Sequence, residues 1–121
     1  MKVVGCPREI KEQENRVALT PSGTRQLVRN GIKVLIETGA GMGADYGDDE
    51  YQRAGAEILP HAAGLFEEAD LVVKVKEPQG NEIAMLRQGQ TLFTYLHLAA
   101  DRELTEKLVA TGVTAIAYET I

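Results

Sequence analysis

Short apolar runs rich in β-branched residues alternate along the chain with segments whose apolar positions recur at helical spacing. Several of these apolar runs end at a proline or a charged residue, as strands of a buried sheet do. We therefore expect strands at residues 2–6, 32–37, 56–59, 70–76, 89–96 and 113–119, with a shorter extended piece at 16–19.

The polar residues between these runs predict where the helices begin and end. Thr20 followed by Pro21 is a typical helix start, because the hydroxyl caps the helix and proline has no N–H to leave unpaired in the first turn. Asn30 and Gly31 are typical of a helix end at which one residue adopts the left-handed backbone conformation. Further helices are expected at about 48–54, 60–69, 81–86 and 101–111.

Strand and helix alternation with short connections indicates one α/β domain, Rossmann-like or flavodoxin-like. Such a pattern gives a mostly parallel sheet covered by helices on both faces. No helix follows the last expected strand before residue 121. We therefore expect a sheet that is incomplete at its C-terminus and a chain that is one segment of a longer polypeptide.

Composition narrows the class of protein. The chain has 121 residues, a net charge of −5, and 44% apolar residues, which is enough for one core without metals or disulfides. A broad basic face for nucleic acid is not expected at this charge, nor is a membrane-spanning segment, since no apolar run approaches ~20 residues. The single cysteine, Cys6, fits a buried apolar position in a cytoplasmic protein.

A glycine-rich stretch, GAGMGA at 39–44, formally matches a dinucleotide-binding fingerprint. Its phosphate site requires a helix that begins inside the motif. Here Gly47 and Asp48 place the helix start later, and neighbouring carboxylates repel a phosphate. Both readings remain open, and a tight structural loop is the favoured one.

Three cationic positions and a histidine fall near expected strand ends. Lys74 and Lys76 alternate with valines, and a lysine there must either emerge from the sheet or be paired. His97 follows a central strand at the end where parallel sheets bind ligands, and Arg16 follows a polar loop. Taken singly, each is more often structural or solvated, as we expect for His61; together they indicate a small-anion site.

Five stretches resemble alanine dehydrogenase, a family whose opening segment is shared with the α subunit of nicotinamide nucleotide transhydrogenase. They are GCPREIK at 5–11, ENRVALTP at 14–21, ETGAG at 37–41, KVKEP at 74–78 and LHLAA at 96–100. The last two resemble the dehydrogenase more than the proton pump.

The resemblance implies a reaction in which L-alanine, NAD⁺ and water give pyruvate, ammonium and NADH. It also implies that residues 1–121 are an N-terminal substrate-binding segment of a homo-oligomeric oxidoreductase of amino-acid catabolism. The NAD-binding Rossmann domain, with the glycine motif and a catalytic aspartate, is absent from this chain. We therefore expect NAD to be bound by that missing domain, and the isolated chain to be inactive.

The resemblance further assigns roles to single residues. Arg16 is expected to hold the substrate carboxylate, Lys76 to bind the substrate and stabilise developing charge, and His97 to exchange a proton with the substrate oxygen. Lys74 is the weaker lysine candidate, and no roles are assigned to Tyr95 and Glu119. No metal ligand or cofactor-binding residue is expected.

Two alternatives remain beside this interpretation. The chain could be the corresponding segment of a transhydrogenase α subunit, or a non-catalytic module that binds small anions.

Overall fold

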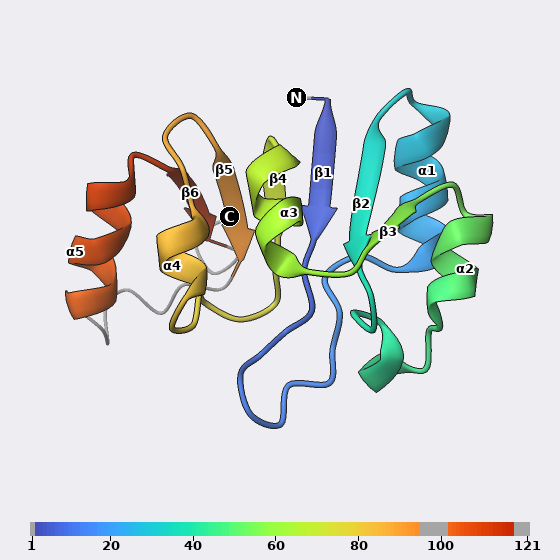
Figure 1. Cartoon of the computed structure of the whole chain (residues 1–121), viewed down its shortest axis with the longest axis horizontal. Coiled ribbons are helices and arrows are strands. Elements are labelled where there is room, and N and C mark those ends of the chain that lie inside the picture. The colour runs from blue at the N-terminus through green and yellow to red at the C-terminus, as the bar shows by residue number, and fades with distance from the viewer. Residues whose placement is uncertain (1, 95–101, 118–121) are drawn as a thin grey trace.

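A six-stranded, entirely parallel sheet forms the centre of the computed structural model, which describes residues 2–94 and 102–117 (Figure 1). The strand order is β3-β2-β1-β4-β5-β6. The strands are β1 (Val3–Cys6), β2 (Lys33–Glu37), β3 (Glu57–Leu59), β4 (Leu71–Val73), β5 (Thr91–Thr94) and β6 (Thr114–Ala117). The α/β fold with a parallel sheet that the sequence predicts is confirmed.

Helices lie in the connections between the strands, as expected. The Thr20 hydroxyl caps the first helix by accepting the Gly23 N–H. Gly31, just after the helix, has a φ of 81°, in the left-handed region of backbone conformation. The helices are α1 (Pro21–Arg29), the 3₁₀ turn η1 (Met42–Ala44), α2 (Asp48–Arg53), α3 (Ala62–Glu68), α4 (Glu82–Met85) and α5 (Arg102–Thr111).

The sheet has an apolar cluster on each face. On one face, Leu35 and Val72 pack with Leu65 and Phe66 of α3 and with Leu108 of α5. On the opposite face, the strand residues Cys6, Val34 and Ile36 pack with Tyr51 of α2 and with residues of α1. Because successive side chains of a strand point to opposite faces, helices on both faces follow from the apolar runs.

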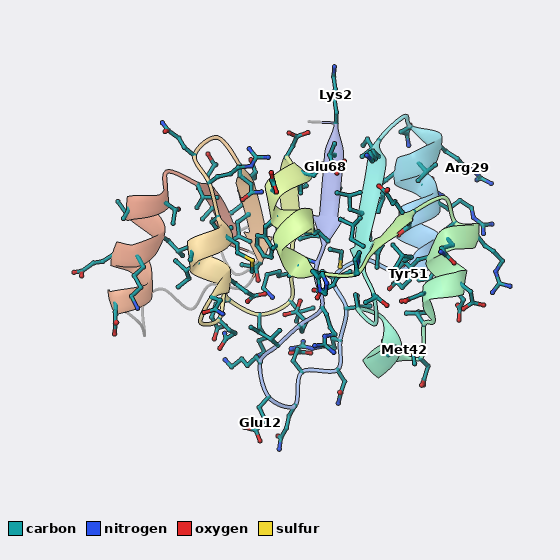
Figure 2. All side chains as sticks on the ribbon, in the orientation of Figure 1. Lys2, Glu12, Arg29, Met42, Tyr51 and Glu68 are labelled. Carbon is teal, nitrogen blue, oxygen red and sulfur yellow. The ribbon has the colours of Figure 1, made fainter. Side chains whose placement is uncertain are left out.

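The carboxyl ends of all strands meet at one edge of the sheet, the lower edge in Figure 1. The chain runs outward from β1 to β3, then returns to place β4 beside β1 and runs outward again to β6. Ligands of open α/β sheets bind at such a switch point. The long loop after β1 extends below this edge, with Glu12 near its tip (Figure 2).

Two local expectations were wrong. Residues 16–19 form no strand, and β4 ends at Val73 instead of continuing to residue 76. Lys74 still donates its N–H to the Phe93 carbonyl, but the next two N–H groups turn to the Glu9 carboxylate. A side chain from the β1 loop therefore replaces the strand ladder at this point.

Among the described residues, no helix has the length and apolarity required to cross a bilayer.

Candidate functional site

The loop after β1 and the glycine-rich loop after β2 enclose a hollow of about 210 Å³ at the carboxyl edge of the sheet. Its lining is polar and includes Arg8, Glu14, Arg16 and Gly43. Arg16 therefore lies where the fold predicts a ligand site.

Glu14 holds the guanidinium of Arg16 through two bonds. Arg16 donates from Nε to Oε2 at 3.0 Å and from Nη2 to Oε1 at 2.9 Å. The Glu14 side chain is only 5% exposed, whereas that of Arg16 is 64% exposed. The hydrogen bond from Arg16 outweighs burial and lowers the pKa of Glu14, so this carboxylate stays ionised and orients an accessible guanidinium.

Lys76 lies at the same edge, half-buried, in the loop after β4. Its ammonium contributes to lowering the Glu14 pKa, so its charge reaches the Arg16–Glu14 pair. A second ion pair joins the loop after β1 to the loop after β4, because Lys11 Nζ lies 2.6 Å from Glu77 Oε1. Arg16 and Lys76 thus belong to loops that follow two adjacent parallel strands, β1 and β4, at the carboxyl edge of the sheet.

Lys74 has a different environment. Its side chain is 0% exposed, and its Nζ lies 3.0 Å from Glu9 Oε1 and 3.1 Å from Glu82 Oε2. Both carboxylates are nearly buried as well, which fits the rule that a buried lysine must be paired. Lys74 therefore links the loop after β1, through Glu9, to helix α4, through Glu82. Lys76 is the lysine available to a ligand.

The remaining candidates divide into two groups. Cys6 is buried and burial raises the pKa of its thiol to about 12, and His61 is exposed, as the sequence predicts. His97 lies outside the described residues, as do Tyr95 and Glu119.

The glycine-rich loop does not suit a dinucleotide. A Cβ on Gly41 would lie 2.6 Å from the Tyr51 ring, and one on Gly43 would lie 2.8 Å from the Asn15 carbonyl oxygen. The absence of side chains at these two glycines therefore lets the loop pack closely against Tyr51 and Asn15. The helix that follows starts only at Asp48, and its first turn carries three carboxylates that repel a pyrophosphate. Among the described residues, no group of three or more potential ligands could hold a metal ion.

Sequence reasoning missed Glu9 and Glu14. Both are acidic residues in a charged loop, a setting that usually indicates solvated side chains. A buried lysine among valines was the signal for a carboxylate partner, but it did not identify Glu9, whose contacts lie 65 to 67 positions away along the chain.

Comparison with known proteins identifies the family. Residues 5–121 match the model "Alanine dehydrogenase/PNT, N-terminal domain". The chain is 53% identical over 119 residues to an alanine dehydrogenase of Bacillus subtilis, covering 98% of this chain and 31% of that protein. An alanine dehydrogenase of Halomonas elongata is 52% identical over 118 residues, covering 98% and 32%. The chain thus spans about a third of the length of these curated relatives.

Solved structures give the same result. An L-alanine dehydrogenase superposes with a TM-score of 0.94 at 53% identity, over 97% of this chain and 32% of that chain. A transhydrogenase from Sinorhizobium meliloti superposes with a TM-score of 0.90 at 30% identity, over 98% and 35%. The family model matches residues 5–121, and the fold match covers 97% of the chain, so the chain belongs to the alanine dehydrogenase/PNT N-terminal domain family.

Proposed function

We propose that this chain is the substrate-binding part of an NAD-dependent alanine dehydrogenase. In this role it binds L-alanine and pyruvate at the carboxyl edge of its sheet. The observation that carries the proposal is that Arg16 lines the hollow in the loop after β1, while Lys76 lies in the loop after the adjacent parallel strand β4. The higher identity to alanine dehydrogenases than to the transhydrogenase, 53% against 30%, favours this activity over the proton pump.

Arg16 binds the substrate carboxylate in this proposal. A guanidinium offers a planar fork that matches two carboxylate oxygens, which lysine does not reproduce. Glu14 accepts bonds from Nε and Nη2 on one edge of the guanidinium, so the orientation of the guanidinium is set before the substrate arrives. In this proposal the substrate carboxylate binds at the edge formed by the two terminal nitrogens.

Lys76 supplies positive potential beside the substrate oxygen, where negative charge develops during the reaction. His97, which follows the last residue of β5 by three positions in the sequence, exchanges a proton with that oxygen, since the ordinary pKa of histidine lies close to neutrality. Both roles rest on the family resemblance together with the position of Lys76 in the structure.

Hydride transfer is the chemistry of a nicotinamide. We place NAD on another domain of the enzyme, because the glycine-rich loop of this chain packs against Tyr51 and Asn15 and faces carboxylates. Mixing the chain with L-alanine and NAD⁺ should therefore give no NADH absorbance.

We also propose that copies of this chain associate with one another. A cytoplasmic location is part of the same proposal. Val109 on α5 and Ile116 on the edge strand β6 are exposed apolar residues at one end of the sheet. Size-exclusion chromatography should show a dimer or larger species, and a monomer at all concentrations would contradict this part.

The binding role can be tested by titrating the ¹⁵N-labelled chain with pyruvate. We expect amide shifts confined to the loops after β1, β2 and β4, and loss of these shifts in Arg16→Ala. Arg53→Ala is the matched control, because Arg53 pairs with Asp49 on the exposed surface of α2. Absence of saturable shifts, or equal binding by Arg16→Ala, would contradict the proposal.

A further inference from the structure

The backbone of Lys76 is held from both sides, by the loop after β1 and by the end of β5. On one side, Glu9 Oε1 accepts the Lys76 N–H at 3.2 Å, and Glu9 Oε2 accepts the Val75 N–H at 2.9 Å. On the other side, Thr94 at the end of β5 donates its hydroxyl to the Lys76 carbonyl at 2.9 Å. The loop after β4 is thereby fixed to the loop after β1 on one side and to the end of β5 on the other.

The components of this arrangement are buried, which makes it rigid. Thr94 is fully buried, and the Glu9 side chain is 4% exposed. Lys74 fixes Glu9 in turn, since its buried ammonium lies between Glu9 and Glu82. Breaking a buried hydrogen bond to a charged group is costly, because the group that loses its partner stays buried and cannot bond to water instead.

Nothing in the fold alone requires these contacts at Lys76. A strand that continued to residue 76 would satisfy the same N–H groups within the sheet. Instead the chain leaves the sheet at Val73, and a carboxylate and a hydroxyl replace the strand neighbours. The result is a half-buried lysine whose side chain starts from a fixed backbone at the switch point.

We propose that Glu9 and Thr94 are positioning residues that clamp the Lys76 backbone and so aim its ammonium at the substrate oxygen. This inference rests on the proposed binding role of Lys76 and extends it to two residues that act through the Lys76 backbone. The clamp converts a flexible lysine into a preorganised group, which reduces the ordering required upon binding.

The test compares pyruvate dissociation constants of the full chain by NMR titration. Thr94→Val removes the hydroxyl at nearly constant shape and should weaken binding about 10-fold, as expected for one lost hydrogen bond to an ordered site. Thr94→Ser keeps the hydroxyl and should restore the affinity. Thr91→Val is the matched control at the other end of β5, and it should bind as the unmodified chain does.

Glu9→Gln provides a second variant, with Glu82→Gln as its control. Both change a carboxylate that faces Lys74, but only Glu9 accepts the Lys76 N–H. Glu9→Gln should weaken pyruvate binding, and Glu82→Gln should leave it nearly unchanged.

A double-mutant cycle separates positioning from general stability. In a Lys76→Ala background, Thr94→Val should have little further effect, because the group it positions is gone. Additive losses, or loss of affinity that Thr94→Ser does not restore, would overturn the clamp. A Lys76→Ala chain with unchanged affinity would contradict the proposed function itself, whereas weak binding by Lys76→Ala with normal binding by Thr94→Val and Glu9→Gln would contradict the clamp alone.

Discussion

Gly43 lies so close to Asn15 that a Cβ on the glycine would approach the Asn15 carbonyl oxygen to 2.8 Å and its Cα to 2.9 Å. Asn15 immediately precedes Arg16, the residue that we assign to the substrate carboxylate. The glycine-rich loop thus forms one wall of the hollow beside Arg16 and sets how near the β1 loop can come. This contact gives the GAGMGA stretch a packing role in the site.

The first prediction follows from this contact. Gly43→Ala should displace the backbone at Asn15 and weaken pyruvate binding, because the guanidinium of Arg16 moves with it. Gly64→Ala is the control, since a Cβ at Gly64 meets nothing within 4 Å on helix α3. That control should keep its affinity and gain about 0.5–1 kcal/mol in the free energy of unfolding. Equal binding by both variants would show that the loop does not position Arg16.

The second prediction concerns the buried cluster of Lys74, Glu9 and Glu82. Lys74→Met leaves two buried carboxylates facing each other without a cation, so the free energy of unfolding should fall by about 3–5 kcal/mol. Lys107→Met removes an exposed helical pair with Glu103 and should cost no more than about 0.5 kcal/mol. Urea denaturation measures both values, and similar values for the two variants would contradict the structural role of Lys74.

The third prediction is a dependence of stability on pH that originates at Asp70. Its carboxylate accepts the N–H groups of Lys2 and Val3, and these bonds lower the pKa of Asp70 below its ordinary 3.8. The stabilisation is therefore complete above pH 3.8 and is lost as the pH falls through the lowered value. Asp70→Asn should reduce the loss of stability in acid, while Asp49→Asn should retain the slope of the unmodified chain. An unchanged slope in Asp70→Asn would remove Asp70 as its source.

The fourth prediction uses Cys6 as a reporter of folding. Because burial raises the pKa of its thiol to about 12, an aromatic disulfide reagent should react with the folded chain very slowly at pH 8. Reaction should accelerate in urea in parallel with unfolding measured by circular dichroism. Rapid modification in buffer alone would indicate that the carboxyl end of β1 opens without global unfolding.

Local signals predicted the elements well, whereas the contacts that build the site come from distant residues. Thr20 and Pro21 place the start of α1 correctly because capping depends on neighbours in sequence. The end of β4 was misplaced because Glu9, far along the chain, takes the N–H groups of Val75 and Lys76. The Glu9 carboxylate also pairs with the ammonium of Lys74 and so distinguishes buried Lys74 from half-buried Lys76, which alternation along a strand does not do.

In the function that we propose, Arg16 of this chain binds the substrate carboxylate. The most direct measurement replaces the matching segment of the Bacillus subtilis alanine dehydrogenase with this chain and determines kinetic constants for the hybrid enzyme. We predict an active hybrid in which Arg16→Lys raises the KM for pyruvate at least ~10-fold and leaves the NADH affinity unchanged, with Arg53→Lys as an unaffected control. An active hybrid in which Arg16→Lys leaves the pyruvate KM unchanged would contradict the claim.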